Sequence, residues 1–89
     1  MDVTSSHSRD PVAGWDITAS AKADKGEKIA RAQIFVNDFP EYDEQFSPPV
    51  SSWQQQLRQQ GDYPGDNKVR VVITNDQEED AESVDAWSD

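Results

Sequence analysis

In the stretch GDYPGDNKVRVVITND, residues 61–76, several local signals of secondary structure agree. The first half of the stretch is rich in glycine, proline, aspartate and asparagine, the residues that form turns. Val69, Val71 and Ile73 then alternate with Lys68, Arg70 and Thr74, until Asn75 and Asp76 end the run. Alternation with a period of two is typical of a strand that buries one face. The stretch therefore predicts a turn that leads into a half-buried β-strand.

The composition sets the size of the core. Eighty-nine residues make one small domain, near the size at which a single core is only just sufficient. The chain has no cysteine, so neither a disulfide nor a thiolate metal site supplements that core. Three Trp, three Phe and two Tyr supply large side chains to bury. We expect a folded domain with loose ends.

The first eleven residues are polar and predict a flexible N-terminal leader, followed by a single domain over residues 12–89. His7 is the only histidine of the chain and lies in this leader. Catalysis by histidine needs a second positioned group. We therefore interpret His7 as a bystander. The leader also has no apolar stretch of the kind found in a signal peptide.

The charge of the chain excludes two classes of partner. Eighteen acidic residues against eight basic ones give a net charge of −10. Nucleic-acid backbones and anionic membrane surfaces are bound through lysine and arginine, so neither is expected as a partner. No apolar run approaches the roughly 18 residues that cross a membrane, so membrane insertion is not expected.

Alternation of apolar and polar residues predicts further strands on both sides of the opening stretch. Residues 15–24 and 28–37 each place apolar side chains on one face, and residues 24–27 form a turn between them. In the second segment this face is expected to hold Ala30, Ala32, Ile34 and Val36. Residues 39–49 are less regular, and Pro40 restricts them to an edge strand, which we expect to be short and to be ended by Pro48 and Pro49. The last strand, within residues 81–88, faces inward either with Val84 and Ala86 or with Ser83, Asp85 and Trp87.

The segment SSWQQQLRQQG, residues 51–61, is ambiguous. A serine cap, the glutamine run and a terminal glycine favour a helix. Trp53, Gln55 and Leu57 also fit one face of a strand, and two strong apolar residues are too few for a stable amphipathic helix. The fold class is therefore all-β, a small immunoglobulin-like β-sandwich, with an α+β arrangement (ββαβ, helix near residues 50–60) as the alternative.

Two short motifs carry a resemblance to a known family. The sequence GDNKVRVVITND resembles the G-x-N-x-V-x-V-x-x-T-D pattern of bacterial immunoglobulin-like domains. IFVND resembles the V-x-V-N-G that ends an early strand in that family, with Asp38 in place of the usual glycine. The resemblance covers roughly residues 14–88 and departs from the family pattern in the glutamine-rich middle. It implies a β-sandwich in an envelope or secreted setting.

The sequence predicts no catalytic site, no cofactor site and no metal site. No nucleophile–histidine set can be assembled around one histidine in a leader, and no phosphate-binding or zinc-binding motif is present. Asp76, Glu78 and Asp80 alternate in a way that can gather oxygen ligands for calcium. No glycine follows to make the tight bend, so we expect these carboxylates to splay into water.

Three functions remain open for a non-catalytic acidic domain. The first is an immunoglobulin-like structural, adhesion or protein-interaction module in a larger envelope or secreted assembly. The alternative is a free-standing acidic cytosolic protein that binds a basic partner, which would show steep salt dependence. The third is a carbohydrate module, which needs Trp15, Trp53 or Trp87 exposed as a stacking platform, whereas tryptophan is more commonly buried.

Overall fold

The computed structural model describes residues 1–12, 14–60 and 65–88. The described residues contain no helix, and they form seven strands: β1 (Asp2–Arg9), β2 (Trp15–Lys22), β3 (Ile29–Val36), β4 (Phe39–Val50), β5 (Ser52–Gln60), β6 (Asp66–Asn75) and β7 (Asp80–Ser88). The all-β prediction is confirmed. The helix considered near residues 50–60 is not formed, because this segment is strand β5, with Trp53 buried and Gln55 and Leu57 half-buried on the same face.

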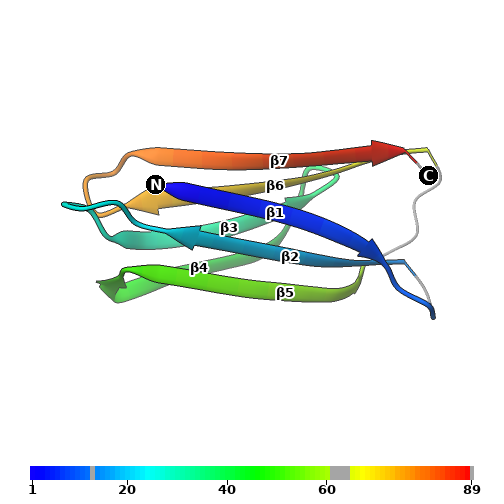
Figure 1. Cartoon of the computed structure of the whole chain (residues 1–89), viewed down its shortest axis with the longest axis horizontal. Coiled ribbons are helices and arrows are strands. Elements are labelled where there is room, and N and C mark those ends of the chain that lie inside the picture. The colour runs from blue at the N-terminus through cyan, green and yellow to red at the C-terminus, as the bar shows by residue number, and fades with distance from the viewer. Residues whose placement is uncertain (13, 61–64, 89) are drawn as a thin grey trace.

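The strands form two antiparallel sheets packed face to face (Figure 1). One sheet has three strands in the order β1-β2-β5, and the other has four in the order β4-β3-β6-β7. The chain crosses between the sheets after β2, after β4 and after β5. The molecule is therefore an elongated β-sandwich with the strands running along its length.

The core lies between the sheets and is built from the rows that alternate along β2, β3 and β6. Its buried members are aliphatic, with one tryptophan from β5: Ile17, Ala19, Ala21, Ile29, Ala32, Ile34, Val36, Trp53, Val69, Val71 and Ile73. Larger side chains at the margins complete the layer, among them Trp15, Tyr42, Phe46, Leu57 and Trp87. They compensate for the small alanines of β2, as a close-packed interior requires.

The start of β3 differs from the expected alternation. The sequence pattern placed Ala30 in the row with Ala32, but Ile29 is fully buried and Ala30 is only half-buried. Between Ile29 and Arg31 the pairing of β3 shifts against both of its neighbours, β4 and β6. Such an irregularity changes the phase of the side chains. It brings the larger Ile29 into the core in place of Ala30.

The prediction of a flexible leader over residues 1–11 is wrong for Asp2–Arg9. These residues form strand β1, which pairs along its whole length with β2 from Asp2↔Lys22 to Arg9↔Trp15. The folded unit therefore includes residues that the expected domain of 12–89 left out. Alternation of apolar and polar residues does not reveal β1, because its half-buried side chains are mostly polar: Val3, Ser5 and His7.

The expected edge strand β4 is longer than the sequence suggested. It extends over Phe39–Val50 and includes Pro40, Pro48 and Pro49. These prolines are compatible with a strand because β4 has a neighbour, β3, on one side only. In β7 the second of the two expected faces is correct: Ser83, Asp85 and Trp87 are half-buried, whereas Val84 is 51% exposed.

Residues with positive φ angles form the turns. Asn37 and Asp38 have φ of 50° and 69°, and they join β3 to β4 in the type of two-residue hairpin that requires left-handed backbone at both positions. Gly65 has a φ of 94° and open space where a Cβ would be, so a larger residue there is opposed by backbone strain alone. The first part of that turn, residues 61–64, lies outside the described residues.

Replacement of Val71 or Ile73 by aspartate should unfold the domain. Both side chains are fully buried in the core, and an unpaired buried charge costs several kcal/mol against a total stability of about 5–15 kcal/mol. Val84→Asp, at an exposed position on neighbouring β7, is the matched control and should remain folded. Thermal melting followed by circular dichroism distinguishes the two outcomes, and native-like melting of Val71→Asp would contradict this account of the core.

Candidate functional site

The structure brings His7 into contact with two tryptophans. The imidazole stacks on the ring of Trp87, with centroids 3.8 Å apart and planes at 10°. The ring of Trp15 meets the imidazole edge-on, with the two centroids 5.5 Å apart. The guanidinium of Arg9 lies over the same Trp15 ring, 4.8 Å from its centroid. Both indole nitrogens are buried without a hydrogen-bond partner in the described part of the chain. Burial of the rings, and not their polar edges, therefore stabilises the cluster.

A row of polar side chains joins β1 to β7 across the edge of the sandwich. Nδ1 of His7 lies 2.5 Å from a carboxylate oxygen of Asp85, and the hydroxyls of Ser5 and Ser83 are 3.0 Å apart. β1 and β7 belong to different sheets, so these contacts close one side of the sandwich. His7 lies in strand β1 and not in a flexible leader, and Asp85 and Trp87 position it.

The same row has the residue types of a catalytic triad, and in it the two serines bond to each other. An aspartate that holds a histidine is one part of acyl-transfer chemistry, and a serine activated by that histidine is the other. Here Ser5 and Ser83 bond to each other, and the histidine ring is covered by Trp87 on one face. The arrangement fits a structural contact that holds β1 against β7. The expectation of a non-catalytic protein remains a prediction.

Loss of the contacts of His7 with Asp85 and Trp87 should destabilise the domain. His7→Ala removes a stacked ring and a hydrogen bond to a carboxylate, and should lower the free energy of unfolding by about 1–2 kcal/mol. Ser8→Ala, on the exposed face of the same strand, is the control and should be close to neutral. Urea unfolding followed by tryptophan fluorescence measures both. Equal stability of the two variants would show that β1 is not fastened through His7.

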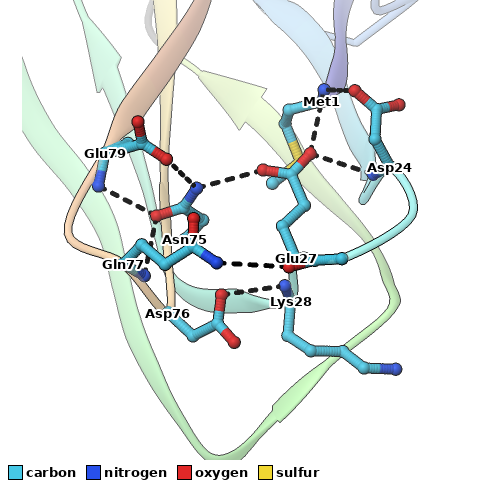
Figure 2. Close-up of polar contacts among 9 residues, drawn as sticks. Met1, Asp24, Glu27, Lys28, Asn75, Asp76, Gln77 and Glu79 are labelled. Atoms are coloured by element: carbon cyan, nitrogen blue, oxygen red, sulfur yellow. Dashed lines mark hydrogen bonds and ion pairs between the residues drawn. The ribbon is translucent and has the colours of Figure 1, made fainter.

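A second polar cluster lies at one end of the sandwich, where the loop between β2 and β3 meets the loop between β6 and β7 (Figure 2). Asn75 is buried at its centre. Its amide nitrogen donates to Glu27 and to Glu79 at 3.0 Å, and its amide oxygen accepts from the backbone nitrogens of Gln77 and Glu79 at 2.9 Å. One asparagine thus binds the two loops together.

Glu27 is the most perturbed carboxylate of this cluster. Its pKa is lowered from 4.5 to about 2, first by the side chain of Asn75, then by the backbone nitrogen of Asp24, and then by the ammonium group of Met1, 3.1 Å away. All three contacts favour the charged form. Only 16% of the Glu27 side chain is exposed, so this carboxylate is a fixed structural anion.

The three acids that the sequence singled out as a possible calcium loop have separate surroundings. Asp76 accepts a hydrogen bond from the backbone nitrogen of Lys28, and Asp80 accepts one from the hydroxyl of Thr74. Glu78 has a φ of 62° and an exposed side chain. Within residues 1–12, 14–60 and 65–88, no three acidic or histidine side chains gather in a way that could hold a metal ion.

The perturbed pKa of Glu27 predicts acid sensitivity. A carboxyl group whose pKa is lower in the folded than in the unfolded state stabilises the fold above the unfolded value, and this stabilisation is lost as the pH falls through the folded value. The window here extends from about pH 4.5 to about pH 2. Glu27→Gln should reduce both the stability at pH 7 and the loss of stability within that window. Glu78→Gln, in the facing loop, is the control. Urea unfolding at a series of pH values measures both effects, and an unchanged pH dependence in Glu27→Gln would contradict the assignment.

Arginine and apolar side chains lie together on the outer face of the four-stranded sheet. The guanidinium of Arg70 lies 4.5 Å from the centre of the Phe35 ring. Arg70 pairs with Val84 on one side and with Phe35 on the other, and Val72 is the next residue of β6 on this face. We call Phe35, Arg70 and Val84 the outer patch; Val72 lies beside them but is only 9% exposed. The outer patch is a partly apolar surface at the middle of a sheet.

Carboxylates surround the outer patch. Arg70 also lies 3.5 Å from Glu82, and Arg31 forms two hydrogen bonds with Asp43, at 2.9 and 2.6 Å. The pair lowers the pKa of Asp43. Asp80 extends the acidic margin along β7. The face thus has an apolar centre with arginine and an acidic border.

The three tryptophans lie in the core or pack against it. Trp53 is buried in the core at 8% exposure, and Trp15 and Trp87 are half-buried and pack on His7. Trp87 also lines a shallow groove of about 580 Å³ beside the turn at Asn37 and Asp38. A carbohydrate-stacking role needs a freely exposed ring, and these rings pack against other side chains.

Comparisons of the chain with protein-family models, with curated proteins and with solved structures found no match. The described residues include no helix of the length and apolar character that a membrane crossing needs.

Proposed function

We propose that this chain is a non-catalytic protein-interaction module, a β-sandwich that serves as a structural or adhesive unit in a larger assembly. The observation that carries the proposal is the outer patch. Arginine and aromatic side chains are enriched where proteins bind one another, especially at the centre of the contact. The open face of the four-stranded sheet places such residues together in an otherwise acidic chain.

The groups capable of chemistry support the same proposal, because they are engaged in holding the fold. His7 and Asp85 join the two sheets, and Glu27 and Asn75 join two loops. Reactive groups of an enzyme instead converge on a pocket that can hold a substrate. The resemblance to bacterial immunoglobulin-like domains agrees with a binding module and extends the proposal to an envelope or secreted setting.

The charge of the outer patch suggests the chemistry of the partner. Asp43 and Glu82 are already paired with arginines, so Asp80 and the net negative charge of the chain are what favour a protein surface with an apolar centre and a basic margin. The net charge of −10 would accelerate the approach of such a partner at low salt. The alternative of an acidic protein that blocks a basic partner uses the same attraction without the apolar centre.

Site-specific photo-crosslinking in the cells from which the sequence comes tests the proposal. A photoreactive side chain at Val84, in the outer patch, should form adducts with one protein, and Arg70→Ala should reduce their yield severalfold. The same group at Ser6, exposed on β1 of the three-stranded sheet and away from β5, is the matched control and should form few adducts. Absence of adducts at Val84, or equal yields at both positions, would contradict the proposal.

A further inference from the structure

The two sheets of the sandwich are unequal, and this leaves one side incomplete. Four strands face three, and β1 and β7 close one side through His7–Asp85 and Ser5–Ser83. On the other side the outermost strands are β4 and β5, which belong to different sheets and are not paired with each other. β5 therefore has a free backbone edge, since β2 is its one paired neighbour among the described residues.

The free edges of the sandwich differ in how they are protected. Natural proteins protect edge strands with proline, with charge or with a covering segment, because an unpaired edge recruits other strands. β4 contains three prolines and three acidic residues, and β7 contains three acidic residues and contacts β1. β5 extends over nine residues with no proline and no acid, and its one charged residue is Arg58. It is the least protected of these edges.

Partly exposed apolar side chains lie next to that edge. Tyr42 and Phe46, on the inner face of β4, and Leu57, on the inner face of β5, pack at the margin of the core and are only half-buried. The indole nitrogen of Trp53 donates to the Tyr42 hydroxyl at 3.3 Å, which links β5 to β4. A fourth strand in the three-stranded sheet would cover Tyr42 and Phe46 and equalise the two layers.

A carboxylate lies within the same margin. Glu44 occupies the inner-facing row of β4 between Tyr42 and Phe46, it is exposed, and it accepts a hydrogen bond from the Tyr42 hydroxyl. An incoming strand would therefore meet two aromatic rings and one negative charge along a single row. Apolar side chains suit the rings, and lysine or arginine suits Glu44.

We propose that the free edge of β5 binds an extended segment of another protein as an additional strand, with apolar residues facing Tyr42 and Phe46 and a basic residue facing Glu44. Main-chain hydrogen bonds to the edge would supply affinity, and the alternate side chains would supply specificity. This surface lies on the opposite side of the sandwich from β7, so it is separate from the outer patch and does not depend on it.

A second copy of this chain is the less favourable occupant. Each copy carries a net charge of −10, and pairing of two β5 strands would bring two sets of β4 carboxylates, including Glu44, towards each other. Like charges across an interface oppose association. A basic segment gains from the same carboxylates.

Binding of a synthetic strand tests the proposal. The probe is a capped nine-residue peptide in which threonine alternates with leucine and lysine. It should slow amide hydrogen exchange in β5, measured by NMR, more than in β1, β4 or β7. Two further peptides carry N-methyl groups on alternate backbone nitrogens, each in one of the two possible phases. One of them should lose binding, because one set of nitrogens bonds to the edge. Retained binding by both, or protection of another edge, would overturn the proposal.

Charge variants test the chemistry of the occupant. Glu44→Gln should weaken binding of the lysine peptide about fivefold, the value expected for one partly exposed ion pair. Glu82→Gln, on the opposite edge strand, is the matched control and should leave the affinity unchanged. A peptide with glutamate in place of lysine should bind more weakly. Equal affinity of the two peptides, or dimerisation of the protein through β5 in sedimentation experiments, would overturn the basic-segment assignment.

Discussion

Pairing between β3 and β6 organises the core of the sandwich. These two strands form the centre of the larger sheet, and their buried rows, which include Ile34 opposite Val71, supply much of the core. A chain of 89 residues without cysteine has no covalent support for so small a core. The three-stranded sheet therefore has to cover this row, and β2 does so with Ile17 and two alanines while Trp53 of β5 fills the remaining space.

The ends of β6 show how the fold uses its polar residues. Asn67 and Asn75 are the two buried polar residues among those described, and they lie near opposite ends of this strand. Asn67 accepts a hydrogen bond from Asn37 in the β3–β4 turn, and Asn75 holds Glu27 of the β2–β3 loop. A buried amide is costly unless its bonds are satisfied, so each asparagine favours one arrangement of the loops around it. The central strand thus fixes the core through its middle and the loops through its ends.

The sequence predicted the strands that alternate strongly and missed what depended on contacts between distant residues. Val69, Val71 and Ile73 identified β6 because one face of that strand is apolar throughout. The same reasoning missed β1, because its inward row is completed by Ser5 and His7, which are polar and find their partners 78 residues away on β7. Ile29, and not Ala30, is buried in the core because the pairing of β3 shifts between Ile29 and Arg31. The pattern of apolar residues does not reveal such a shift. In β5, burial of Trp53 between the sheets decided in favour of a strand where local propensity was divided.

The connection of the strands has a consequence for the speed of folding. The β3–β6 ladder joins segments that are far apart in the chain, and β5, which completes the smaller sheet, pairs with the distant β2. Domains dominated by such non-local pairings fold in about milliseconds to seconds, because loop closure costs entropy before any contact forms. The hairpins β1–β2, β3–β4 and β6–β7 are local and can form first. β5 has no hairpin partner, so its docking into the smaller sheet requires the distant β2 to be in place.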